Sequence, residues 1–181
     1  MIIGLTGTMG SGKGEIANYL IKKGFEYYCF SDILKEEAEK RNIKPTRKNL
    51  QKLGNDIKKD KANRGILAKR ILERIKTDNV VLDGIRNVDE VRELRKAKEF
   101  FLVGVNAEQK LRFIRLKKRA RAGDPTDFND FKKLDDKENK GITKGQEINK
   151  CLKMADFTLL NNGSLEELKE ETERILKNIM P

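Results

Sequence analysis

The sequence predicts an α/β protein with three layers, in which a five-stranded parallel sheet is covered by helices on both faces. Short apolar segments alternate with longer segments of helical periodicity, and neither long linkers nor internal repeats interrupt them. Strands that are separated by helices need crossover connections, which produce a parallel sheet. Because 181 residues suit a single core, we expect residues 1–181 to form one domain.

The segments expected to be strands are short and apolar, as in sheets that are covered on both faces. They are residues Ile2–Thr6, Tyr27–Phe30, Val80–Asp83, Phe100–Val105 and Phe157–Leu160. Ser31 and Thr46 are expected to cap the N-termini of two helices. Ser164 and Glu167 have the spacing of a capping box before the last helix. Ligands of such folds bind at the carboxyl ends of the strands.

A glycine-rich loop with the spacing of a phosphate-binding P-loop follows the first strand. It leads from Gly7 through four residues to Gly12-Lys13, and a helical pattern begins at once. The glycines let several N–H groups point at one anion, and the lysine can reach the outer phosphates. We expect all of its residues to contact the nucleotide: Gly7, Thr8, Met9, Gly10, Ser11, Gly12, Lys13, Gly14 and Glu15.

Position 14 differs from most P-loops, which have Ser or Thr there. Gly14 lacks the hydroxyl that usually binds Mg²⁺. Either the ion is held by nucleotide oxygens, waters and a carboxylate elsewhere, or the loop binds nucleotide without turnover. We favour the first interpretation. A separate apolar strand ends in Asp83, and this pattern delivers an aspartate to the Mg²⁺ beside a P-loop.

Several charged residues are candidates for binding the acceptor of a phosphoryl group. Arg86 follows Asp83 closely and can contact a phosphate through its planar guanidinium, with a surface salt bridge as its alternative role. Asp32 can bind the acceptor or act as a base, or simply favour a helix dipole. Arg41 and Arg47 flank a proline, and either could bind an acceptor phosphate.

The stretch 119–143 is rich in Asp, Lys and Gly, and it has few apolar residues. Seven of the thirteen residues from Gln109 to Arg121 are Lys or Arg and lead into it. We therefore expect a mobile lid that closes over phosphates, with Arg115, Arg119 and Arg121 as clamps. A disordered surface loop is the alternative.

The composition excludes several classes of protein. The formal net charge is +11, but basic residues are scattered among 29 acidic ones and aromatic residues make up only 6%, so no specific nucleic-acid partner is expected. The absence of histidine excludes histidine acid–base catalysis. Two cysteines suit a reducing cytosol, and no apolar run approaches the roughly 20 residues of a membrane span. We expect a cytoplasmic monomer or homodimer.

These motifs together resemble a family of P-loop kinases related to adenylate, deoxynucleoside monophosphate and dephospho-coenzyme A kinases. The resemblance covers essentially the whole chain and is carried by four segments: Gly7–Gly14, Val81–Arg86, the Arg115/Arg119/Arg121 cluster with Asp124-Pro125, and Ala155–Leu165. It implies the P-loop NTPase fold of nucleoside monophosphate kinases. The implied parts are a core (1–30, 77–118 and 144–181), an acceptor-binding helical insert (31–76) and a lid (119–143).

The resemblance also implies transfer of the γ-phosphoryl group of ATP with Mg²⁺. The Asn161-Asn162-Gly163 loop resembles the loop that touches the nucleotide base in this fold, although a plain turn has the same composition. Three functions stay open: a (deoxy)nucleoside monophosphate kinase, a dephospho-coenzyme A kinase in which Asp32 acts as the base, and a non-catalytic nucleotide-binding or nucleic-acid-associated module. Gly14 favours the first, since adenylate kinases also have Gly there.

Overall fold

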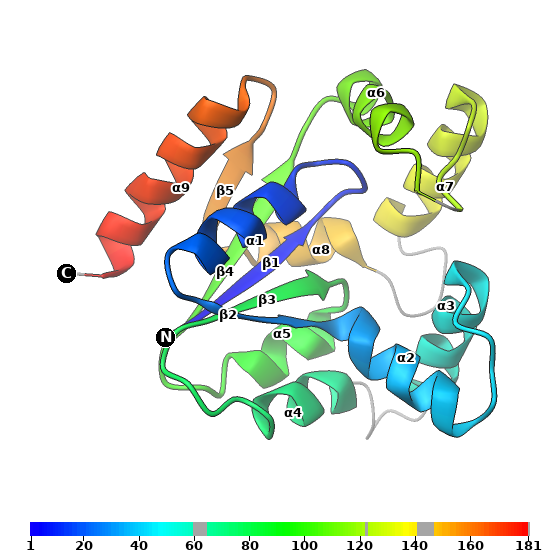
Figure 1. The fold of residues 1–181 in the computed structure, drawn as a ribbon, viewed down its shortest axis with the longest axis horizontal. Helices are drawn as coiled ribbons and strands as arrows, with labels where there is room; N and C mark the ends of the chain where they lie inside the picture. The colour runs from blue at the N-terminus through cyan, green and yellow to red at the C-terminus, as the bar shows by residue number, and fades with distance from the viewer. Residues whose placement is uncertain (60–64, 122, 141–146, 181) are drawn as a thin grey trace.

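The computed structural model describes residues 1–59, 65–121, 123–140 and 147–180. Its sheet has five parallel strands in the order β2-β3-β1-β4-β5 (Figure 1). The strands are β1 (Ile2–Gly7), β2 (Glu26–Cys29), β3 (Val80–Ile85), β4 (Phe100–Asn106) and β5 (Phe157–Leu160). The predicted fold class is therefore confirmed.

Helices cover both faces of the sheet. One face is covered by α1 (Lys13–Lys22) and α9 (Leu165–Ile179). The other face is covered by α2 (Phe30–Lys40), α4 (Ile66–Leu72), α5 (Val88–Leu94) and α8 (Ile148–Lys153). Three further helices, α3 (Arg47–Ile57), α6 (Gln109–Arg119) and α7 (Phe128–Lys140), lie on the side toward which the strands point (Figure 1). In the part of the chain that the structure describes, no helix is long and apolar enough to cross a membrane.

The alternation of side chains along the central strand divides the core into two layers. Every residue of β1 is buried. Ile3 and Leu5 pack beneath α1 and α9, whereas Ile2 packs with the helices of the opposite face. Both faces of β1 are thus apolar, which fixes the strand that leads into the P-loop at the centre of the sheet.

The helix caps predicted from the sequence are present in the structure, with one exception. Thr46 caps α3 by accepting the N–H of Asn49 at 3.2 Å, and the capping box of Ser164 and Glu167 is present. The prediction of Ser31 as an N-cap is wrong, because α2 begins at Phe30 and its N-cap residue is Cys29. The predicted second strand ends one residue early for the same reason. Phe30 is buried in the core as a helical residue, and this tertiary packing outweighs the capping preference of serine.

Helix α7 occupies most of the segment predicted to be a lid. Phe131 is fully buried, and its ring lies 5.5 Å from that of Phe113 and 6.0 Å from that of Phe128. The few apolar residues of the segment are therefore enough to hold it against α6, and the alternative of a disordered loop is wrong for residues 128–140. Residues 122 and 141–143 of the predicted lid, 60–64 of the insert and 144–146 of the core lie outside the described residues. The division into core, insert and lid stays a prediction.

Candidate functional site

The P-loop connects β1 to α1 through a glycine in the left-handed conformation. Gly12 is the N-cap of α1, with φ of 105°, and no side chain caps the helix. A Cβ atom at this position would collide with the side-chain amide of Asn161. Glycine is thus required here both by backbone conformation and by the close approach of the neighbouring loop.

The start of α1 presents polar groups without protein partners. Among the described residues, the N–H groups of Gly12, Lys13 and Gly14 find no acceptor, and Ser11 Oγ is buried without a hydrogen bond. Gly14 and Glu15 are exposed at the first turn. Free N–H groups at the positive end of a helix dipole form an anion-binding site. The residues present therefore fit the phosphates of a nucleotide.

Lys13 is held by its own loop. Its Nζ donates to the carbonyl oxygens of Gly7 at 2.8 Å and Thr8 at 2.9 Å. Burial lowers the pKa of Lys13 to about 8, and the nearby carboxylate of Asp83 opposes this shift. Two neutral carbonyls compensate an ammonium group only in part, so an anion that replaced them would stabilise the charged form.

Asp83 lies in the second half of β3, beside the P-loop, and the strand continues two residues beyond it to Ile85. Asp83 is in register with Leu5 of β1 and Cys29 of β2. Its Oδ1 is buried and has no hydrogen-bond partner among the described residues, while Oδ2 accepts the hydroxyl of Tyr27 at 3.4 Å. Burial raises the pKa of Tyr27, and the neighbouring Cys29 and Asp83 raise it further. A buried carboxylate oxygen without a donor fits a ligand of a hard cation such as Mg²⁺.

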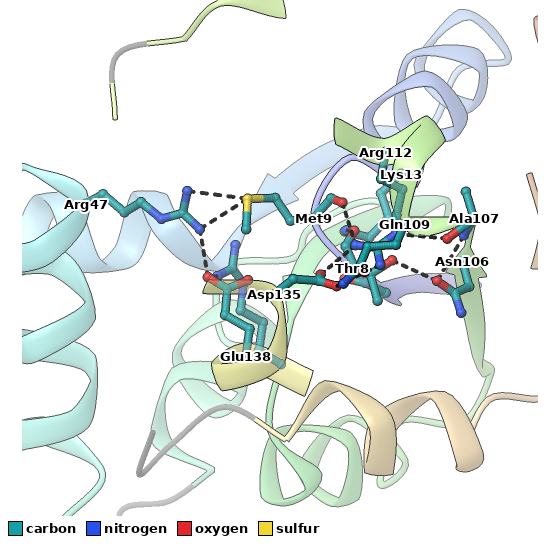
Figure 2. Close-up of polar contacts among 12 residues, drawn as sticks. Thr8, Met9, Lys13, Arg47, Asn106, Ala107, Gln109, Arg112, Asp135 and Glu138 are labelled. Atoms are coloured by element: carbon teal, nitrogen blue, oxygen red, sulfur yellow. Dashed lines mark hydrogen bonds and ion pairs between the residues drawn. The ribbon is translucent and has the colours of Figure 1, made fainter. Parts of the chain in front are cut away.

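A buried arginine joins the P-loop to α6 and α7 (Figure 2). Arg112 donates from Nη1 to the carbonyl of Met9 at 3.1 Å and from Nε to that of Ala107 at 2.8 Å. It also forms a two-pronged ion pair with Asp135 of α7, at 2.5 and 2.8 Å. Asp135 accepts a further bond from Gln109 at 3.0 Å. Through Arg112, these contacts connect the P-loop backbone at Met9 to both α6 and α7.

Asn161 also contacts the P-loop, at Ser11. Its Nδ2 donates to the carbonyl of Ser11 at 2.9 Å, and Arg115 donates to its backbone and side-chain oxygens at 2.9 and 3.3 Å. Desolvation lowers the pKa of Arg115. Asn162 accepts the N–H of Glu108 at 2.9 Å. The structure thus gives Asn161, Asn162 and Arg115 contacts that brace the loops. Gly163 precedes the capping box of α9.

Three separate parts of the chain meet at the carboxylate of Glu138, and Figure 2 shows its contact with Arg47. Arg47, from α3, donates to Glu138 Oε1 at 2.7 Å and contacts Met9 Sδ at 3.5 and 3.6 Å. Arg86, which follows β3, has Nη1 3.9 Å from the same carboxylate oxygen. Glu138 belongs to α7 and is buried. Two of the predicted acceptor-binding arginines therefore meet beside the P-loop.

Other predicted site residues have partners elsewhere. Asp32 is exposed and pairs with Lys35 at 2.7 Å, and Arg41 pairs with Glu37 one helical turn earlier at 2.6 Å. Among the described contacts, neither reaches Arg47. The structure therefore does not place Asp32 or Arg41 with Arg47 and Arg86 around Glu138.

The two arginines of the predicted lid differ from each other. Arg119 binds Asp124 through Nε and Nη2, at 2.9 to 3.1 Å. Arg121 is exposed, and its side chain makes no hydrogen bond or ion pair with any described residue. Neither side chain contacts the described P-loop in this state.

Three residues of the site are not predicted from the sequence: Arg112, Asp135 and Glu138. The sequence contains a signal for Asp135 and Glu138. Residues 131, 135 and 138 have the spacing of one helical face, which carries a Phe and two carboxylates. Such a face indicates buried ion pairs, since carboxylates are rarely buried without a partner.

Comparison with known proteins gives the family. A family described as an AAA domain matches residues 3–140. UPF0200 proteins of Hyperthermus butylicus and Thermococcus kodakarensis are 33% and 34% identical to this chain, cover 99% of it, and are themselves covered to 95% and 98%. A Thermus thermophilus protein superposes with a TM-score of 0.64 at 20% identity, covering 100% of this chain and 98% of its own.

Shikimate kinases have the same fold. The enzyme from Bacteroides thetaiotaomicron superposes with a TM-score of 0.62 at 14% identity, covering 100% of this chain and 99% of its own. The enzyme from Aquifex aeolicus gives 0.55 at 19% identity, with 98% and 97% covered. Identities at this level show the fold alone, which this chain shares with shikimate kinases. By its sequence, the chain belongs to the UPF0200 family.

Proposed function

We propose that this protein is a kinase that transfers the γ-phosphoryl group of ATP to a small phosphorylated nucleotide, namely a nucleoside or deoxynucleoside monophosphate. The observation that carries the proposal is the meeting of Arg47 and Arg86 beside the P-loop, where Met9 contacts Arg47. A second anion site next to the nucleotide phosphates is what a phosphorylated acceptor requires.

The P-loop would bind the donor through the start of α1. The N–H groups of residues 12–14 and the helix dipole hold phosphate oxygens. Lys13 would exchange the carbonyls of Gly7 and Thr8 for phosphate oxygens, which are better partners for an ammonium group. Positioning and charge neutralisation are the main requirements of this reaction.

Asp83 would hold Mg²⁺, which neutralises developing charge on the phosphates when it is bound. The free Oδ1 of Asp83 supports this role. Among the described residues, no group of three or more His, Cys, Asp or Glu could hold a metal by itself. A Cβ at Gly14 would have no heavy atom of the described residues within 4 Å, so none of their hydroxyl groups replaces the missing ligand there. Nucleotide oxygens and waters would complete the coordination.

The acceptor chemistry favours a phosphate over a hydroxyl. A phosphate needs no base, which agrees with the absence of histidine. A dephospho-coenzyme A kinase would need a base for its hydroxyl acceptor, and the candidate Asp32 is exposed and paired with Lys35. This pairing lowers the availability of Asp32 and supports the nucleotide acceptor.

Release of ADP, followed with Mg²⁺ and ATP over a panel of nucleoside monophosphates and dephospho-coenzyme A, tests the proposal. We expect release with a monophosphate and none with the Lys13→Met variant. ATP binding without ADP release for every acceptor would instead indicate the non-catalytic module.

A further inference from the structure

A buried carboxylate lies behind the two arginines that we assign to the acceptor. Glu138 Oε1 is 2.7 Å from Arg47 Nη2 and 3.9 Å from Arg86 Nη1. We infer that Glu138 is a specificity-determining residue, an internal counter-ion that limits the negative charge of the acceptor anion bound by Arg47 and Arg86. The inference rests on the proposed function, because it concerns the acceptor site of that reaction.

The exposed fractions of the three side chains show that Glu138 lies deeper in the protein than the two arginines. The side chain of Glu138 is 6% exposed, whereas those of Arg47 and Arg86 are 37% and 43% exposed. An anion that enters from solvent therefore meets the guanidinium groups first. Glu138 remains behind them, where it reduces their attraction for the anion without blocking contact.

The charges of the cluster favour an anion of low charge. Among the described residues, two arginines face Glu138, which leaves one net positive charge for a ligand. Asp124 lies 4.0 Å from Arg47, but it pairs with Arg119 at 2.9 Å and adds no net charge. The phosphate dianion of a nucleoside monophosphate exceeds this charge by one, so Glu138 weakens its binding, and groups that carry more negative charge are disfavoured further at this partly buried site.

The position of Glu138 is set by the packing of its helix. Phe131 and Asp135, on the same face of α7, are buried against Phe113 and Arg112. These contacts lie earlier in α7 and do not involve Glu138. A glutamine at position 138 therefore keeps the shape of the cluster and removes only the charge, which separates an electrostatic role from a structural one.

Binding of inorganic phosphate, measured by calorimetry with the P-loop filled by Mg²⁺ and the analogue AMP-PNP, tests the inference. At about pH 8, where phosphate is mostly a dianion, Glu138→Gln should bind it about tenfold more tightly than the unaltered protein. Asp130→Asn is the matched control, because Asp130 is exposed on the same helix and pairs only loosely, at 3.5 Å, with Lys133. The Arg47→Gln/Glu138→Gln double variant should lose the gain, which locates the phosphate at this site.

Equal phosphate affinity in Glu138→Gln and the unaltered protein would overturn the inference. If the variant is unfolded in buffer without phosphate, added phosphate should refold it while sodium chloride of equal ionic strength does not, and failure of this rescue would also overturn it. The measurement needs no turnover. If AMP-PNP does not bind at all, the proposed function fails as well, whereas normal AMP-PNP binding with an unchanged phosphate affinity rejects only the role of Glu138.

Discussion

Arg112 and Asp135 form a buried, two-pronged ion pair that joins α6 to α7, at N–O distances of 2.5 and 2.8 Å. The same guanidinium donates to the carbonyl of Met9 in the P-loop. The helix that carries Glu138 is thereby connected to the loop that would hold the nucleotide. We therefore expect a structural change in α7 to affect the P-loop through Arg112, and a change in the P-loop to affect α7 in the same way.

Breaking this pair should destabilise the protein strongly. Asp135→Asn leaves the Arg112 charge buried without compensation, so the free energy of unfolding should fall by about 3–5 kcal/mol. Urea denaturation measures the loss. The exposed Asp130→Asn control should change it by less than about 1 kcal/mol. Losses of similar size in both variants would show that the pair contributes no more than a surface contact.

The depressed pKa of Lys13 predicts a pH dependence of nucleotide binding. In the free protein the pKa is about 8, and phosphate oxygens favour the protonated lysine. Above pH 8 binding must therefore include proton uptake, and the affinity for metal-free ATP should fall by up to about tenfold per pH unit. Titrations from pH 7 to pH 9 measure the slope. Lys13→Met should keep the fold, abolish turnover and bind ATP with a flat pH profile, and a slope that persisted in this variant would assign the titration to another group.

Asp83 should act through the metal. We expect Asp83→Asn to lower turnover by about a hundredfold or more, because the amide is a poorer ligand for Mg²⁺ and lacks the carboxylate's charge. Affinity for ATP in the absence of metal should change far less. Turnover against Mg²⁺ concentration, together with metal-free ATP titration, separates the two quantities. Parallel losses in both would indicate that Asp83 has a structural role.

The arginines of the predicted lid should affect turnover only through contacts that form when phosphates are bound. Arg119→Ala and Arg121→Ala should each slow turnover more than they weaken ATP binding, because we place their phosphate contacts in a closed state. Arg119 must leave Asp124 to make such contacts, whereas Arg121 has no described side-chain partner to leave.

Hydrogen exchange distinguishes moving from fixed parts of this segment. The amides of α7 around the buried Phe131 should be protected already in the free protein. Residues 123–127 should gain protection when a bisubstrate analogue binds. Unchanged exchange of residues 123–127 at saturation would remove the proposed roles of Arg119 and Arg121.

The net charge of +11 should not produce specific binding to nucleic acid. Binding to DNA or RNA should be weak, indifferent to sequence and lost as salt rises, because scattered basic residues contribute only a nonspecific phosphate attraction. Fluorescence anisotropy at two salt concentrations measures it. Tight binding at moderate salt, or stimulation of ATP hydrolysis by a polynucleotide, would favour the nucleic-acid-associated alternative.

Features that depend on neighbouring residues in the chain could be predicted from the sequence. The five strands, the cap at Thr46 and the capping box at Ser164 agree with the structure within one or two residues. Their physics is local, since apolar runs form strands and a hydroxyl reaches an N–H three residues on. The prediction at Ser31 failed because burial of Phe30 moves the start of α2 to an N-cap at Cys29, before Ser31, and burial is a tertiary quantity.

The sequence by itself determined the P-loop and the carboxylate near the end of an apolar strand, since both depend on short-range spacing along the chain. Only the tertiary structure decided which arginines meet. Arg112, Arg115 and Arg119 share one helix, yet each finds a different partner, and the partner of Arg112 lies 23 residues away on α7. The docking of Phe131 against α6 brings Asp135 to Arg112 and Glu138 toward Arg47 and Arg86. Charge pairing acts over a few ångströms in space, whereas the sequence specifies neighbours only along the chain.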